Sequence, residues 1–372
     1  MPEERDARWF AERMPSREVL QSVLHGDPVK RLLGIAAYRA IANPSVVPVP
    51  KPDADEREVE HALKLAIAAA KKVAADGENA QLSEDEKEAL ELFVLLVSRP
   101  AILVQDGRVR ERPENWPEIA RDEELLPKVL AGVGRIERAS GVKCGTGFVA
   151  GERRVLTNNH VICALFGQHP DYWKHAPEAF AKLCDEASRE WSDTLEIAPV
   201  FELRGEAGSA ASSHARISRI LGHHANVDMA VLELDAQPAG ARRLALAKDE
   251  PASFKGRRVY AVGYPVDDVR DGLGRRITPA HVFHRIFGND AQTLGRKRFS
   301  PGCITKWSSA SDEFQHDAST LPGSSGSCIV DFEERRVVGL HFAGSWEQKL
   351  NLAVPLWKFR ADPVLAKNGV KF

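Results

Sequence analysis

The stretch Leu321-Pro-Gly-Ser-Ser-Gly-Ser-Cys328 decides the fold once the residues upstream of it are considered. A Gly-x-Ser-Gly run is weak evidence alone, because small residues crowd any tight turn. Upstream, however, stand Leu156-Thr-Asn-Asn-His-Val161 and Asn226-Val-Asp-Met-Ala-Val-Leu-Glu-Leu234. One His, one Asp and one Ser therefore follow one another along the chain, each beside a short apolar run that is typical of a strand.

His160, Asp228 and Ser325 have the residue types and the chain order of the chymotrypsin triad. A serine hydroxyl is a poor nucleophile unless a base accepts its proton, and the base needs a carboxylate that fixes its tautomer. We therefore expect Ser325 to be the nucleophile, His160 the base and Asp228 the orienting acid. The backbone N–H groups of Gly323 and Ser325 are expected to form the oxyanion hole. Each residue alone would be an ordinary core, turn or loop residue, but the ordered set indicates a serine protease.

Length and composition exclude several other classes. The 372 residues exceed what one hydrophobic core usually serves, so two domains are expected. A net charge of −2 gives no basic surface for nucleic acid, and no apolar run approaches the roughly 20 residues of a membrane-spanning helix. The charged N-terminus, residues 1–8, lacks the apolar core of a signal peptide, so a cytoplasmic location is expected.

The chain has five cysteines: Cys144, Cys163, Cys184, Cys303 and Cys328. Their odd number and the lack of an export signal favour free thiols, although a disulfide between Cys144 and Cys163 stays open. No three or four metal ligands converge in the sequence, so we expect no metal site and no cofactor. The histidines at 223–224 and at 281 and 284 are expected to lie in loops or on the surface.

Helix signals dominate residues 1–125, which we expect to form an α-helical regulatory or interaction domain. Asp27-Pro28 starts one helix, and apolar residues at helical spacing predict another over residues 59–73. Ser83 and Glu86 form a predicted capping box. A proline-rich linker is expected at residues 46–52.

Strand signals begin near residue 130, after a charged connector over residues 107–127. Short apolar runs then alternate with turn residues, which predicts an all-β sandwich or barrel as a protease domain over residues 130–365. A helix-like stretch at residues 171–190 interrupts the strands as an expected surface insertion.

Several short motifs resemble those of trypsin-like (chymotrypsin-fold) serine peptidases, and are most similar to the bacterial glutamyl-endopeptidase branch. They are Gly145-Thr-Gly-Phe-Val149, Leu156-Thr-Asn-Asn-His-Val161, Asp228-Met-Ala-Val-Leu232, Gly263-Tyr-Pro265, Gly323-Ser-Ser-Gly-Ser327, Gly339-Leu-His341 and Asn351-Leu-Ala-Val-Pro355. The resemblance covers residues 132–360 and implies a mainly β fold of two packed six-stranded β-barrels with the site between them. Ser324 departs from the usual Asp or Asn of the family, and Cys328 from the usual Pro.

The resemblance also implies which residues bind substrate. Thr320 and His341 match positions that hold the acidic substrate side chain in glutamyl endopeptidases, and a donor-rich pocket floor suits a carboxylate. Cleavage after Glu or Asp is therefore expected. Against it, the family pattern also uses a freed N-terminal amine, whereas this chain carries an N-terminal domain. The substrate backbone is expected to pair with the edge formed by Phe342, Ala343 and Gly344.

Two other interpretations stay open. A chymotrypsin-like fold that has lost catalysis would be a binding module, since fold does not determine function. An esterase with the same triad is chemically accessible, but the chain lacks the Gly-x-Ser-x-Gly context of α/β-hydrolases. For an active endopeptidase, we expect the helical domain either to inhibit the protease or to bind a regulatory partner that recruits it to protein or peptide substrates.

Overall fold

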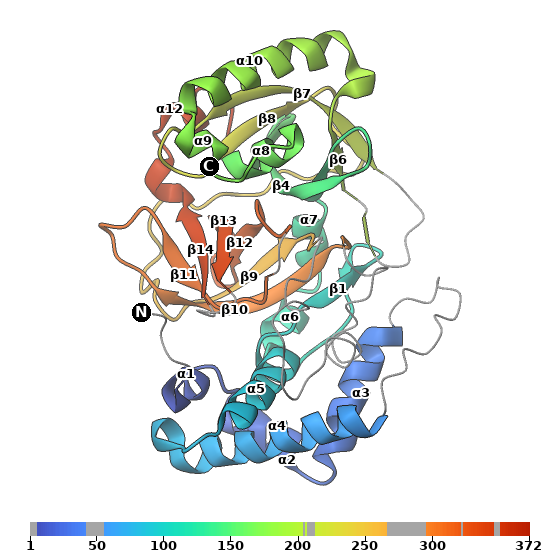
Figure 1. The fold of residues 1–372 in the computed structure, drawn as a ribbon, viewed down its shortest axis with the longest axis vertical. Coiled ribbons are helices and arrows are strands. Elements are labelled where there is room, and N and C mark those ends of the chain that lie inside the picture. Colours follow the sequence, from blue (N-terminus) through green and yellow to red (C-terminus); the bar gives the residue numbers. More distant parts are fainter. Residues whose placement is uncertain are drawn as a thin grey trace.

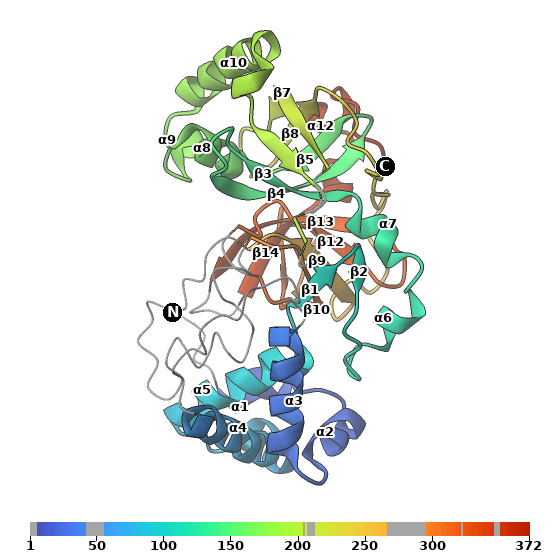
Figure 2. The same ribbon diagram turned by 90° about the vertical axis from the view of Figure 1, so that its right-hand side faces the viewer.

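The computed structural model describes residues 6–41, 56–203, 205–206, 213–265, 295–320, 323–345 and 350–372, which we call the described residues. Three parts are stacked along the long axis of the molecule: a helical part, a β-barrel in the middle and another β-barrel at the other end (Figures 1 and 2). The expected fold, two closed six-stranded antiparallel β-barrels after an N-terminal helical region, is confirmed.

The helical part has its own core, separate from those of the barrels. Its helices are α1 (Ala7–Ala11), α2 (Arg17–Leu24), α3 (Pro28–Ile41), α4 (Glu56–Asp76) and α5 (Glu84–Phe93), and α5 continues as a π-helical turn over Val94–Ser98. Asp27 accepts a hydrogen bond from the Lys30 N–H at the start of α3. The capping box of Ser83 and Glu86 is present at the start of α5. These helix predictions are confirmed, whereas the predicted linker at 46–52 lies outside the described residues.

Strands begin earlier than the sequence pattern indicated. A hairpin of β1 (Ile102–Gln105) and β2 (Arg108–Val109) extends the second barrel, because β1 pairs with β10 (Arg298–Lys306). The two-residue turn between them is Asp106-Gly107, both with positive φ, which is the chemistry of a tight hairpin. The short helices α6 (Pro117–Arg121) and α7 (Leu126–Leu130) then lead into the first barrel. The expectation that this region is helix followed by connector was therefore wrong for residues 102–109.

The first barrel closes in the order β3-β4-β5-β8-β7-β6. Its strands are β3 (Val133–Glu137), β4 (Lys143–Gly151), β5 (Arg154–Thr157), β6 (Val200–Glu202), β7 (His214–His223) and β8 (Ala230–Leu234). In β7, Ala215 and Ile217 are buried while Arg216 and Ser218 are partly exposed, as the two-residue repeat of a strand requires.

Helices between β5 and β6 form the expected insertion. They are α8 (Asn159–Phe166), α9 (Tyr172–His175) and α10 (Pro177–Asp193). Phe180, Cys184, Ala187 and Trp191 of α10 recur at helical spacing and are buried against the first barrel. The predicted helix over 171–190 is confirmed.

The second barrel contains β9 (Arg258–Gly263), β10, β11 (Phe314–His316), β12 (Cys328–Asp331), β13 (Val337–Ser345) and β14 (Leu350–Pro355). It closes in the order β9-β10-β11-β14-β13-β12. After β14 the chain returns to the first barrel, where α12 (Pro363–Ala366) lies near β7 and β8. One hydrophobic core joins the barrels. In it, Leu156 and Met229 from the first barrel region pack in the same cluster as Val262 and Phe299 from the second barrel. This shared core holds the facing ends of the two barrels together.

Candidate functional site

His160 and Asp228 lie together at the ends of two first-barrel elements. His160 is the second residue of α8, and Asp228 stands just before β8. The Nδ1 atom of His160 lies 2.6 Å from Oδ2 of Asp228, and the backbone N–H of His160 donates to Oδ1 at 3.1 Å. Because the carboxylate engages Nδ1, the Nε2 atom is left for another partner.

The loop that carries Ser325 is attached to the first barrel through Thr146 of β4. The Thr146 hydroxyl donates to the Gly323 carbonyl at 2.8 Å, and its backbone N–H donates to the Ser325 carbonyl at 2.8 Å. The same hydroxyl accepts the backbone N–H of Tyr264 at 3.0 Å. Thr146 is fully buried, so these bonds are shielded from water. Thr146 lies within the Gly145-Thr-Gly-Phe-Val149 motif, and nothing in the sequence signals this supporting role.

Glycines shape the turn on either side of Ser325. Gly326 has φ of 89°, and a Cβ atom there would lie 1.8 Å from the Thr146 carbonyl oxygen, so no other residue fits. Its N–H donates to the His341 carbonyl at 2.8 Å. Within the described residues, the backbone N–H groups of Gly323 and Ser325 donate to no protein acceptor. These two donors are therefore available to a bound group.

The segments that carry Ser325 and His160 both lie against Gly145 of β4. A Cβ atom placed on Gly145 would lie 2.7 Å from Val161, the residue after His160, and 3.2 Å from the Ser325 carbonyl oxygen. The Ser325 hydroxyl makes no hydrogen bond to any described residue, His160 included. Catalytic hydrogen bonds are often long in empty sites and shorten when substrate binds.

Thr320 and Gly344 meet at Asn351. The Thr320 hydroxyl donates to Oδ1 of Asn351 at 2.6 Å, and a Cβ atom on Gly344 would lie 2.6 Å from that same oxygen. Ala343 and Gly344 pair with β14, Phe342 lies at a register irregularity between His341 and Ala343, and β12 reaches no further along β13 than Leu340 among the described residues. Among the described residues no strand pairs with the other edge of this stretch, which is the edge at which an added strand would pair.

His341 is buried and lies against a histidine that the sequence analysis did not single out. Its Nδ1 atom is 3.2 Å from Nε2 of His316, the last residue of β11. Both side chains are almost inaccessible to solvent. The expected substrate-binding residues thus form two groups: the β13 edge with Thr320 and Asn351, and a buried histidine pair behind it.

A sequence profile of the trypsin-like peptidase domain matches residues 145–340, which is more than half of the chain. The chain belongs to the trypsin-like peptidase family. Solved structures of the Rv3671c protease from M. tuberculosis are similar to it. The active form is 18% identical over 69% of this chain and 86% of that one, with a TM-score of 0.39. An inactive form is 19% identical over 68% and 94% respectively, again with a TM-score of 0.39. Among curated proteins the search found no match.

In the peptidase, burial controls the charge of the histidine pair. Burial lowers the pKa of His316 to about 4, against a smaller opposing effect of Asp317. Burial also lowers the pKa of His341 well below its usual value, and the neighbouring His316 and His160 add to this. Both rings are therefore neutral at neutral pH. Because Nδ1 of His316 has no partner and is enclosed, we assign its proton to Nε2, which donates to His341.

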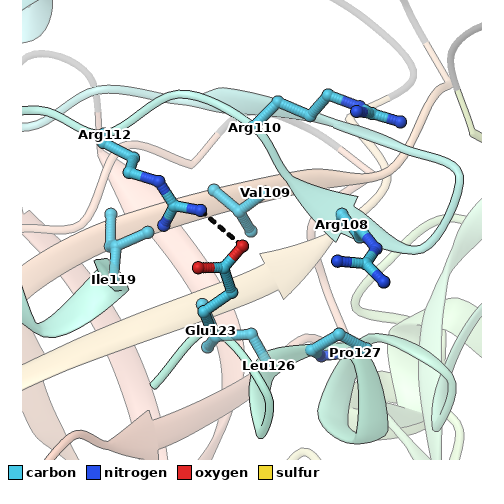
Figure 3. A pocket seen from close by; sticks show the side chains of 8 residues that line it. All are labelled: Arg108, Val109, Arg110, Arg112, Ile119, Glu123, Leu126 and Pro127. Atoms are coloured by element: carbon cyan, nitrogen blue, oxygen red, sulfur yellow. Dashed lines mark ion pairs between the residues drawn. The ribbon is translucent and has the colours of Figure 1, made fainter. Parts of the chain in front are cut away.

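A cavity away from His160 and Ser325 lies between β2 and the helices α6 and α7 (Figure 3). Its lining residues are Arg108, Val109, Arg110, Arg112, Ile119, Glu123, Leu126 and Pro127. Arg112 and Glu123 form an ion pair of 2.6 Å across it. The lining offers no Ser, Cys, His or Lys, and its one carboxylate, Glu123, is paired with Arg112, so the lining holds no serine–histidine pair.

All five cysteines are free thiols, Cys144 and Cys163 included. Over the described residues, no three potential metal ligands cluster, and no helix has the length and apolar character needed to cross a bilayer. The prediction for the histidines at 281 and 284 falls outside the described residues.

Proposed function

We propose that this peptidase is a serine endopeptidase that hydrolyses protein substrates with Ser325 as nucleophile, His160 as base and Asp228 as orienting acid. One observation carries the proposal: the 2.6 Å pair of His160 and Asp228 stands beside the Ser325 loop, which Thr146 ties to the same barrel. A base oriented by a carboxylate next to an otherwise unbonded serine is the arrangement that acyl transfer needs.

In the proposed reaction, Oγ of Ser325 bonds to the substrate carbonyl carbon while Nε2 of His160 takes the hydroxyl proton. The carbonyl oxygen becomes an oxyanion, which accepts hydrogen bonds from the N–H groups of Gly323 and Ser325. Asp228 stabilises the imidazolium. The proton then passes to the leaving amine as the C–N bond breaks, which leaves an acyl-enzyme. Water attacks the acyl group, His160 accepts its proton, and that proton returns to Ser325 as the acid product leaves.

Labelling with a fluorophosphonate probe tests this proposal. The unsubstituted chain should be labelled at Ser325, located by mass spectrometry of the digested product, and Ser325→Ala should lose the label. Asp228→Asn should still fold but label far more slowly, since the histidine loses its orienting carboxylate. Absence of labelling in the folded, unsubstituted chain would contradict the proposal and favour a catalytically silent binding module.

We further propose that cleavage follows Glu or Asp, as in the glutamyl-endopeptidase branch. His341 is a buried neutral ring that hydrogen-bonds to the Leu352 backbone, and it lies on the same barrel as Thr320 and Gly344, so an acidic side chain would have to reach it from that side. Peptides that differ only in Glu, Gln, Leu or Arg before the scissile bond test this. The Glu peptide should exceed the Gln peptide in kcat/KM by about tenfold, the worth of one good hydrogen bond to a charged group. Cleavage after apolar or basic residues alone would refute it.

The helical part is proposed to regulate this activity. Deleting residues 1–125 would not test that cleanly, because the deletion also removes β1, which pairs with β10 of the second barrel. Point substitutions at residues where the helical part contacts the second barrel test the regulation without removing β1. Recruitment of a partner by the helical part stays a prediction of the sequence.

A further inference from the structure

Asp317 is a buried carboxylate at the junction of the helical part and the second barrel. It follows β11 and stands eight positions before Ser325. Its two oxygens accept a bidentate pair of hydrogen bonds from Arg99, at 2.8 Å from Nε and 3.0 Å from Nη2. The Cys303 backbone N–H donates to it at 2.6 Å, and Nε of Arg13 in the helical part lies 3.9 Å away. The side chains of Asp317 and Arg99 are only 5% and 7% exposed.

Arg99 makes a second contact with the same stretch of chain. It directly follows the π-helical turn that ends α5, and its backbone carbonyl accepts a hydrogen bond from the Ser319 hydroxyl. Its own position is fixed, because its Nη1 donates to the Ser98 carbonyl at 2.9 Å and its guanidinium lies over the Trp116 ring. Arg99, at the end of the helical part, therefore holds both Asp317 and Ser319, which lie just before the loop that carries Ser325.

The opposite side of this stretch is held by Asn351 of β14. Its Nδ2 donates to the Ala318 carbonyl at 2.8 Å, and its Oδ1 accepts the Thr320 hydroxyl at 2.6 Å. We call residues 317–320 the substrate-side segment, because it contains Thr320 and lies beside Gly344. Arg99 holds Asp317 and Ser319, while Asn351 holds Ala318 and Thr320, so all four residues are clamped.

The clamp depends on charge as well as shape. Burial alone would raise the pKa of the Asp317 carboxyl, but the Arg99 guanidinium, with Arg13 and the Cys303 N–H, holds that pKa below its ordinary value. Asp317 is therefore ionised across the neutral range. Removing Arg99 would leave a buried carboxylate without its main partner, which is strongly unfavourable. The segment would then rearrange to bring Asp317 to water.

We propose that Arg99 is a positioning residue that holds the substrate-side segment in the shape that binds peptide, through Asp317 and Ser319. The inference rests on the proposed function, since the segment matters to a peptide only if Ser325 cleaves one. The helical part then acts as a structural component of the substrate site, and its contact with the barrel favours activity instead of suppressing it.

Arg99→Leu, Arg99→Lys and a matched control separate this role from general stabilisation. The control is Arg257→Leu, which breaks another bidentate pair, that of Arg257 with the buried Asp331 in the same barrel, and touches no residue of the segment. Arg99→Leu should raise KM for peptides by about tenfold or more while fluorophosphonate labelling of Ser325 stays within about threefold. Arg99→Lys should raise KM less than Arg99→Leu does, because lysine keeps the positive charge but cannot form the bidentate pair with Asp317. Equal losses of labelling and peptide hydrolysis, as expected for Arg257→Leu, would overturn the proposal.

A thiol readout keeps the test independent of catalysis. Sγ of Cys303 lies 3.7 Å from Nη2 of Arg99, so loosening the clamp should expose it. In a Cys144→Ser, Ser325→Ala background, Arg99→Lys and Arg99→Leu should speed the reaction of Cys303 with a thiol reagent, and Arg257→Leu should not. An unchanged Cys303 rate would overturn the clamp. If the unsubstituted chain takes no fluorophosphonate label, the proposed function fails, while the Cys303 rate still decides the role of Arg99.

Discussion

Replacing Thr146 by valine tests whether the nucleophile loop depends on its attachment to the first barrel. Valine keeps the branched shape but removes Oγ1, which donates to the Gly323 carbonyl at 2.8 Å and accepts the Tyr264 N–H at 3.0 Å. An unpaired buried polar group costs about 1–3 kcal/mol. Tyr264 is fully enclosed and Gly323 is half-buried, so the substitution leaves the Tyr264 N–H unpaired and removes one hydrogen bond from the Gly323 carbonyl. We therefore expect the substitution to lower the free energy of unfolding by roughly 2–4 kcal/mol.

Activity should fall further than this loss of stability explains. The substitution frees the Gly323 carbonyl, while the Ser325 carbonyl keeps its bond to the backbone N–H of residue 146; Gly323 is one of the two residues whose N–H groups are proposed to bind the oxyanion. A displacement of about 1 Å in such a site costs about 100-fold in rate. We expect kcat/KM, measured well below the unfolding temperature, to fall by about that factor, with kcat taking most of the loss. Thermal unfolding followed by circular dichroism gives the stability change on the same samples.

Thr157→Val is the matched control. Thr157 is also fully buried, and its hydroxyl donates to the Thr146 carbonyl at 2.7 Å; it packs near Gly326 but makes no hydrogen bond to the loop. It should lose about 1–3 kcal/mol of stability and keep kcat/KM within about threefold of the unsubstituted chain. The reasoning is refuted if both variants lose activity equally, or if Thr146→Val is destabilised but fully active.

Two further predictions concern titration and thiol chemistry. Because burial lowers the pKa of His316 to about 4, the folded chain does not take up the proton that the unfolded chain binds below about pH 6.5. The free energy of unfolding should therefore fall as pH drops from about 6.5 to about 4, by about 3 kcal/mol from this residue. His316→Phe should flatten the dependence of Tm on pH, and parallel plots of Tm against pH for the two proteins would contradict this. Burial also raises the pKa of Cys163 to about 11 and those of Cys184 and Cys328 to about 12. Burial also raises the pKa values of the half-buried Cys144 and Cys303, and Sγ of Cys303 lies against the buried Arg99 side chain. Near pH 8 Cys144 should therefore be the fastest thiol of the folded chain and Cys303 slower, and fast reaction of Cys163, Cys184 or Cys328 would contradict this.

Features with local signals could be predicted from the sequence. The capping box at Ser83 and the helix over 59–73 follow from residues within a few positions of each other, and both are present. The pairing of His160 with Asp228 was predicted from residue types and order, which reflect what the chemistry requires. The hairpin at 102–109 was missed although Asp106-Gly107 is a strong turn signal, because β1 has only four residues and β2 only two, and β2 lies within a charged stretch.

The residues that hold the site in place have no such signal. Thr146 and Gly323 are 177 positions apart, and Arg99 and Asp317 are 218 apart. Each is one of many residues of its type, and its hydrogen bonds matter because two barrels and a helical part exclude water around them. A triad residue is determined by the reaction, whereas a supporting donor only has to reach the right carbonyl or carboxylate. Substitutions at Thr146 and Arg99 should therefore impair the peptidase while every proposed catalytic side chain remains intact, and they distinguish an assembled active site from an intact triad.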